Sequence, residues 1–105
     1  MKRNEYLQKA EHTICRDRQD IHGNPENTHE LIAEYWSTYL TEECKLEVAL
    51  SGADVAIMMT LFKIARMQVN PKHQDNIVDG LGYLAIAGEI IDNITGSDEL
   101  LNLKD

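Results

Sequence analysis

The chain has 105 residues, a net charge of −8 and 43% hydrophobic residues. A chain of this length forms a single domain, over residues 1–105, and buries only a modest core unless it oligomerises. The acidic balance argues against a nucleic-acid-binding surface, which needs clustered lysine and arginine. No apolar run reaches the roughly 18 residues of a membrane span, no signal-like segment follows Met1, and the two cysteines lack CxxC spacing. We therefore expect a soluble cytoplasmic protein.

The first half of the chain predicts two helices with polar outer surfaces. The first covers about residues 3–16 and carries a single apolar stripe. The second begins at Pro25, with Asn24 as its N-cap, and runs to about Leu40. Its apolar residues recur every four positions and are expected to face the core: Leu31 and Ile32, Tyr35 and Trp36, Tyr39 and Leu40. Residues 41–50 are interpreted as a connector with one helical turn.

The second half predicts two helices that are apolar almost all round. Ser51 with Asp54 three residues later forms a capping-box start for a helix over 51–68. The residue before Pro71 resists the helical region, so a new helix is expected from Pro71 to about Ile94. Because no segment alternates in the manner of a strand, the sequence predicts an all-α fold with four main helices in a compact bundle.

Charged pairs interrupt both apolar helices. Lys63 and Arg66 lie one turn apart on the first, and Asp75 and Asp79 lie four residues apart on the second. Two neighbouring carboxylates repel each other, so a divalent cation or a basic partner should compensate them. The cations could bind phosphate. The alternative for Asp79 is a salt bridge to Lys63 or Arg66, and for the two cations it is extension to the surface.

Other polar residues are less specific. Glu30 belongs to a row of glutamates on the second helix, which is either a metal ligand set or a solvated face. His22, His29 and His73 could bind a base, a phosphate or a metal, although lone histidines are usually ordinary polar residues. No zinc-finger spacing and no GxGxxG, GKS/T or GxSxG motif occurs, so the common nucleotide-binding folds and serine hydrolases lack support.

Three glycines within the fourth predicted helix permit close approach of another helix or a ligand. Each lowers helix stability by about 1 kcal/mol relative to alanine. Together with the methionines of the third helix they predict a central seam, which could lie between subunits of a homodimer or homotetramer. The residues concerned are Gly80, Gly82, Gly88, Met58, Met59 and Met67.

Four blocks in order resemble a family of short phage and prophage proteins of unknown function. The blocks are HGNPEN (22–27), WSTYL (36–40), DVAIMMTLFKIAR (54–66) and NPKHQDNIVDGLGYLAIAGE (70–89). The resemblance covers about residues 18–90. The chain has His22 where the family usually has tyrosine. Membership implies a protein that works in the cytoplasm of a bacterial host.

The block that begins at Asp79 also resembles, more remotely, the second acidic helix of MazG-like nucleoside triphosphate pyrophosphohydrolases. Those all-α enzymes use two acidic helices to hold Mg²⁺ and release pyrophosphate. Asn76 stands three residues before Asp79, where that motif requires an acid, so the carboxylate set is incomplete or rearranged.

These observations lead us to expect binding of a nucleotide or related phosphorylated small molecule, with hydrolysis requiring Mg²⁺ as the resemblance implies. The alternative is a non-enzymatic phage protein that sequesters a host signalling nucleotide or inhibits a host protein. A pocket with arginine and aromatic residues but no metal cluster would favour sequestration, and a flat apolar patch would favour protein binding. The residues expected to bind substrate or phosphate are Lys63, Arg66, His22 and Trp36, and those expected to bind metal are Asp75, Asp79 and Glu30.

Overall fold

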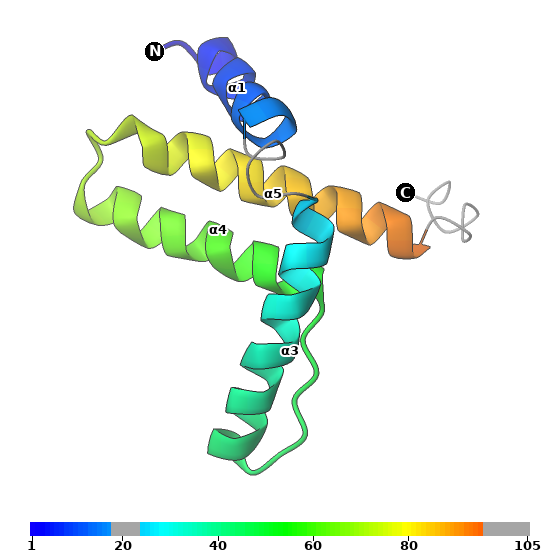
Figure 1. The fold of residues 1–105 in the computed structure, drawn as a ribbon. Coiled ribbons are helices and arrows are strands. Elements are labelled where there is room, and N and C mark those ends of the chain that lie inside the picture. Colours follow the sequence, from blue (N-terminus) through cyan, green and yellow to red (C-terminus); the bar gives the residue numbers. More distant parts are fainter. Residues whose placement is uncertain (18–23, 96–105) are drawn as a thin grey trace, which may run out of the picture.

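The computed structural model describes residues 1–17 and 24–95 and places four α-helices and one short π-helix along them (Figure 1). No strand occurs in these two ranges, and the helices pack against one another, so the all-α prediction is confirmed. The elements are α1 (Arg3–His12), η1 (Thr13–Asp17), α3 (Pro25–Cys44), α4 (Gly52–Val69) and α5 (Gln74–Thr95). Within the same ranges, no helix combines the length and hydrophobicity needed to cross a bilayer.

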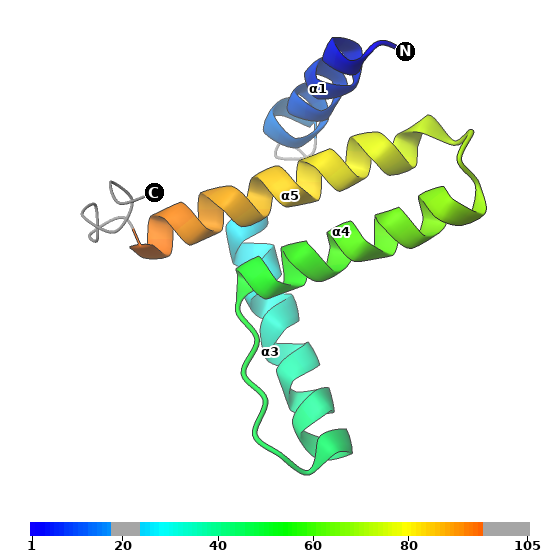
Figure 2. The same cartoon turned by 180° about the vertical axis from the view of Figure 1, so that it is seen from behind.

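Helices α4 and α5 form an antiparallel hairpin at the centre of the molecule (Figures 1 and 2). The capping box at the start of α4 is confirmed, because the Asp54 amide donates to the Ser51 hydroxyl at 3.1 Å and the Ser51 amide donates to the Asp54 carboxylate at 2.9 Å. The prediction that α5 begins at Pro71 is wrong. The His73 amide donates to the Asn70 carbonyl at 3.3 Å, which closes a turn and delays the helix until Gln74.

Helix α3 crosses the hairpin near the start of α4, and its C-terminal half extends away from it (Figures 1 and 2). It ends at Cys44 rather than near Leu40, because Lys45 adopts a left-handed conformation with φ of 55°. The returning segment is bound to α3 by two hydroxyl groups. The Val48 amide donates to Thr41 at 2.9 Å, and the Leu50 amide donates to Ser37 at 2.8 Å.

Helix α1 lies against α5 on the side away from α3 (Figure 1). The predicted single helix over 3–16 is α-helical only to His12 and then continues as the π-helical turn η1. Gly82 of α5 makes the close approach possible. A Cβ atom added at Gly82 would lie 2.7 Å from Cγ2 of Ile14, which is closer than real Cβ atoms approach.

The core is small and consists mainly of short side chains. Its buried apolar residues are Ala10, Ala33, Ala53, Val55, Ala56, Val78, Ala87 and Ile90. Val55 and Ile90 are the largest side chains in the described ranges that are buried completely. Alanine removes little apolar area from water, so the hydrophobic stabilisation of one isolated copy is modest.

The prediction that every apolar pair of α3 faces the core is wrong for half of the residues. Leu31, Tyr35 and Tyr39 are 51%, 69% and 65% exposed. The other members of the pairs, Ile32, Trp36 and Leu40, are half-buried. The buried residues of α3 are His29 and Ala33, and no other described helix covers the side that carries Leu31, Tyr35 and Tyr39.

Candidate functional site

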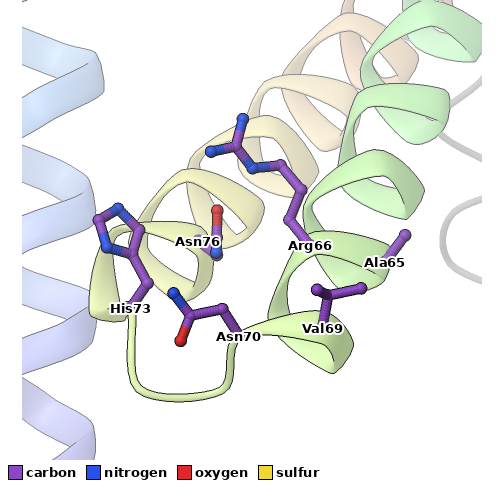
Figure 3. A pocket seen from close by; sticks show the side chains of 6 residues that line it. All are labelled: Ala65, Arg66, Val69, Asn70, His73 and Asn76. Carbon is purple, nitrogen blue, oxygen red and sulfur yellow. The ribbon is translucent and has the colours of Figure 1, made fainter.

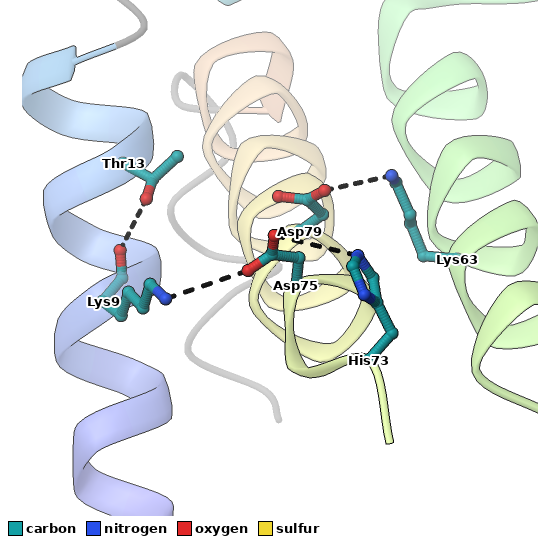
Figure 4. Close-up of polar contacts among 6 residues, drawn as sticks. All are labelled: Lys9, Thr13, Lys63, His73, Asp75 and Asp79. Atoms are coloured by element: carbon teal, nitrogen blue, oxygen red, sulfur yellow. Dashed lines mark hydrogen bonds and ion pairs between the residues drawn. The ribbon is translucent and has the colours of Figure 1, made fainter. Parts of the chain in front are cut away.

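An ion pair links the two central helices. The Lys63 Nζ atom of α4 lies 3.0 Å from Oδ2 of Asp79 on α5 (Figure 4). The two side chains are only 15% and 17% exposed. A carboxylate held this far from water needs compensation, and Lys63 supplies it. This arrangement agrees with the ion-pair alternative drawn from the sequence.

Asp75 is directed towards two other side chains, Lys9 and His73. Its carboxylate lies 3.8 Å from Nζ of Lys9 on α1 and 3.8 Å from Nε2 of His73 (Figure 4). The Asp75 side chain is 63% exposed, so these are weak surface contacts. Asp75 and Asp79 therefore share a helix face in the sequence pattern but are paired with separate neighbours in the structure.

Glu30 lies at the opposite end of the hairpin from Asp75. Its Oε1 atom accepts a hydrogen bond of 3.0 Å from the amide of Gly52, the first residue of α4. Lys63, the partner of Asp79, is 11 residues further along α4, or about 16 Å at a rise of about 1.5 Å per residue. The structure thus does not bring Glu30 to the aspartates. In the described ranges no three His, Cys, Asp or Glu side chains gather to hold a metal, and Mg²⁺ binding stays a prediction.

A cavity of about 480 Å³ lies at the end of the hairpin where α4 turns into α5 (Figure 3). It is lined by Ala65, Arg66, Val69, Asn70, His73 and Asn76. Its polar groups are one guanidinium, one imidazole and two carboxamides. The absence of a carboxylate from this lining is notable in a chain of net charge −8. The lining can donate several hydrogen bonds to an anion, and the Asp75 carboxylate lies beside it, 3.8 Å from Nε2 of His73.

Three parts of the fold position these polar groups. Arg66 extends from the last turns of α4, and its guanidinium lies 5.6 Å from the ring centroid of Phe62, within cation–π range. Asn70 and His73 belong to the turn between the helices (Figure 3). Asn76 is only 4% exposed on the first turn of α5. The groups therefore converge because Pro71 forces the chain to reverse at this point.

The predicted phosphate-binding residues are dispersed. Arg66 lines the cavity, whereas Lys63 pairs with Asp79 and Trp36 is half-buried on α3, which crosses the other end of the hairpin. His22 lies outside the described residues. Asn70 and Asn76 are not among the residues that the sequence predicts to bind a ligand. The available signal for Asn70 is that an asparagine beside a helix-breaking proline is a typical turn residue that exposes polar groups.

His29 has no role in this cavity. It is 6% exposed, its Nδ1 atom lies 2.7 Å from the Pro25 carbonyl oxygen, and its ring meets Tyr83 edge-on at 6.0 Å. The Nε2 atom is buried without a hydrogen-bond partner. These contacts place His29 at the junction of α3 with α5, where it contributes to packing.

Comparison with known proteins places this architecture in a family. Residues 5–91 match the family model described as a domain of unknown function, DUF6378. The chain is 40% identical over 80 residues to the Gene 55 protein of Mycobacterium phage L5, covering 76% of this chain and 48% of that protein. It is 35% identical over 77 residues to the Gene 55 protein of Mycobacterium phage D29, covering 73% of this chain and 47% of that protein.

The chain therefore spans about half the length of these two phage relatives. No solved structure matches it. The expected resemblance to phage proteins of unknown function is supported, whereas the remoter resemblance to MazG-like enzymes stays a prediction. The chain belongs to the DUF6378 family, a family of unknown function that is similar to the Gene 55 proteins of mycobacteriophages.

Proposed function

We propose that this protein binds a nucleotide or a similar phosphorylated small molecule in the cavity at the turn between α4 and α5. The observation that carries the proposal is the lining, which combines Arg66, His73 and two asparagines without a carboxylate. The volume of about 480 Å³ falls within the range of about 300–1,000 Å³ that is typical of ligand pockets.

Each polar group has a role that its chemistry supports. Arg66 offers a planar fork of donors that matches two phosphate oxygens, and the adjacent Phe62 ring restricts where the guanidinium lies. His73 can donate a further hydrogen bond to phosphate. The carboxamides of Asn70 and Asn76 carry both donors and acceptors, which suits the edge of a base or a ribose hydroxyl.

Binding without turnover is the form of this function that the geometry favours. Glu30, Asp75 and Asp79 each contact different groups, and none of these three carboxylates lines the cavity. Because the relatives are phage proteins, the ligand that we propose for sequestration is a signalling nucleotide of the bacterial host.

Mg²⁺-dependent pyrophosphohydrolysis is the second candidate, and one contact favours it. Asp75 lies 3.8 Å from the cavity-lining His73, so a carboxylate is available beside the site. A metal bound by Asp75 and the ligand's own phosphates would not require the complete carboxylate set of the MazG-like enzymes.

The test is binding by calorimetry against a panel of nucleoside triphosphates and cyclic nucleotides, with and without Mg²⁺. Arg66→Gln should weaken binding of the selected nucleotide by about 10–100-fold, because a hydrogen bond to a charged group contributes about 1.5–3 kcal/mol. Lys72→Gln is the matched control, since Lys72 is an exposed cation of the same turn that does not line the cavity.

Three results distinguish sequestration, hydrolysis and the absence of a nucleotide site. Binding that is lost in Arg66→Gln and retained in Lys72→Gln, with no pyrophosphate released, supports sequestration. Release of pyrophosphate that depends on Mg²⁺ and on Asp75 supports the hydrolase. Failure of every nucleotide to bind, or equal loss in both variants, would refute the proposed site.

A further inference from the structure

One side of α4 carries a row of large apolar residues that no other described element covers. We call this row the α4 outer face. Its members are Ile57, Met58, Leu61, Phe62, Ile64 and Val69, which are 38–87% exposed. They recur at the three- and four-residue spacing of one helical face, while the opposite side of α4 packs against α5. Ala65 lies between them and is also exposed.

An uncovered row of this kind is unusual for an isolated domain. Scattered surface leucines need no explanation, but a contiguous apolar stripe marks an interaction surface. Burial of this stripe against a partner would contribute more here than in a typical domain, because the buried apolar core consists mainly of alanines. If a large apolar side chain has a full area of about 200 Å², the six exposed fractions leave about 600 Å² of the outer face accessible to water. A stable interface buries about 800 Å² per partner, so the outer face supplies most of the area that such an interface requires.

The charge distribution favours a second copy as the occupant. The chain has a net charge of −8, so two copies repel each other over most of their surfaces. From Val55 to Val69, however, α4 contains no carboxylate. The outer face is therefore the part of α4 on which two acidic copies can meet without bringing like charges together.

We propose that the α4 outer face binds the same face of a second copy, with the two helices antiparallel about a two-fold axis near Leu61 and Phe62. A two-fold axis at this position sets Met58 opposite Ala65 of the second copy, so a long side chain meets a short one. Arg66 then lies within about one helical turn of Asp54 of the second copy, the single acidic residue of α4.

An apolar recess beside the outer face could receive a side chain of the second copy. It has a volume of about 200 Å³ and lies between α4 and α5, where Ile64, Met67, Leu81 and Leu84 line it. The outer face also borders the cavity of Arg66, because Val69 belongs to both and Ala65, which lies between the members of the face, lines the cavity. The dimer would therefore place each cavity at an end of the interface. The interface does not depend on whether a nucleotide binds there.

The first test is the mass of the protein in solution without ligand, measured by light scattering over a wide range of concentrations. The wild type should be a dimer, and Leu61→Glu should be a monomer. Leu31→Glu is the matched control, because Leu31 is an equally exposed leucine on α3, and it should remain a dimer. Circular dichroism on each variant shows whether its helices are intact.

The second test fixes the orientation. In a background of Cys15→Ser and Cys44→Ser, a Met58→Cys variant is mixed with an Ala65→Cys variant and oxidised. The antiparallel arrangement predicts that the mixed disulfide forms in preference to either symmetric one. A wild type that is monomeric at every concentration, or a Leu61→Glu variant that remains a dimer, would overturn the proposal. The outer face would then be a candidate binding site for a different protein. Symmetric disulfides alone would contradict the antiparallel arrangement.

Discussion

At the scale of single residues, environment decides what the charged side chains do. Asp75 and Asp79 are one turn apart on α5 and chemically identical. Asp79 is 17% exposed and lies 3.0 Å from Lys63, whereas Asp75 is 63% exposed and lies 3.8 Å from both Lys9 and His73. Low exposure strengthens the contact between Lys63 and Asp79, so the loss of either partner should be more destabilising. Water screens the contacts of Asp75. The two aspartates should therefore differ in their contribution to stability.

Substitution of the two lysines tests this difference. Lys63→Met should lower the free energy of unfolding by about 1–3 kcal/mol, because it deprives a largely buried carboxylate of a charged donor. Lys9→Met, which removes the exposed contact with Asp75, should change it by less than about 1 kcal/mol. Urea denaturation measures both. Equal effects would mean that the Lys63–Asp79 pair contributes no more than a surface pair.

At the scale of elements, two close approaches hold the helices in place. Glu30 of α3 accepts from the Gly52 amide at 3.0 Å and so satisfies a free donor at the start of α4. Gly82 of α5 allows η1 to lie against it, since an added Cβ would lie 2.7 Å from Ile14. A Cβ at Gly88 would have no heavy atom within 4 Å. The glycines of α5 thus have different roles.

Alanine substitution should separate these glycines. Gly88→Ala should raise the free energy of unfolding by up to about 1 kcal/mol, the difference in helix propensity between the two residues. Gly82→Ala gains the same propensity but forces Ile14 to move, so we expect a net loss of about 1–3 kcal/mol. Thermal unfolding of both variants is the measurement, and stabilisation by Gly82→Ala would contradict the packing of η1 on α5.

The contact between α3 and α4 can be tested in the same way. Glu30→Ala removes the acceptor of the Gly52 amide and should cost about 1 kcal/mol, as the loss of a helix cap does. Glu30→Gln keeps an oxygen at the same distance along the side chain and should retain more than half of that stability. If Glu30→Gln were as destabilising as Glu30→Ala, the contribution of Glu30 would lie in its charge near the helix N-terminus rather than in the hydrogen bond.

At the scale of the whole molecule, the helices bury little and leave much apolar surface in water. Five of the eight buried apolar residues in the described ranges are alanines, and the α4 outer face and one side of α3 are exposed there. The proposed dimer would therefore stabilise the chain, because binding between folded copies shifts the folding equilibrium by mass action.

The stability of the protein should consequently depend on its concentration. We expect the midpoint of thermal unfolding to rise as the wild-type concentration rises, since each dimer unfolds to two chains. Leu61→Glu, which places a charge on the outer face, should abolish this dependence and leave a lower midpoint. Differential scanning calorimetry at several concentrations provides the comparison, and a midpoint that never shifts in the wild type would argue for a monomer.

The helical elements of this protein can be predicted from its amino-acid sequence, because caps and periodicity act between residues close together in the chain. The capping box of Ser51 and Asp54, the N-cap at Asn24 and the apolar character of the last two helices gave the all-α fold. The contact of Asp79 with Lys63, the exposure of one side of α3 and the proximity of Arg66 to Asn70 and Asn76 follow from the packing of the helices. These features depend on how far apart two helices lie and at what angle they cross, and that geometry results from the packing of all the helices together.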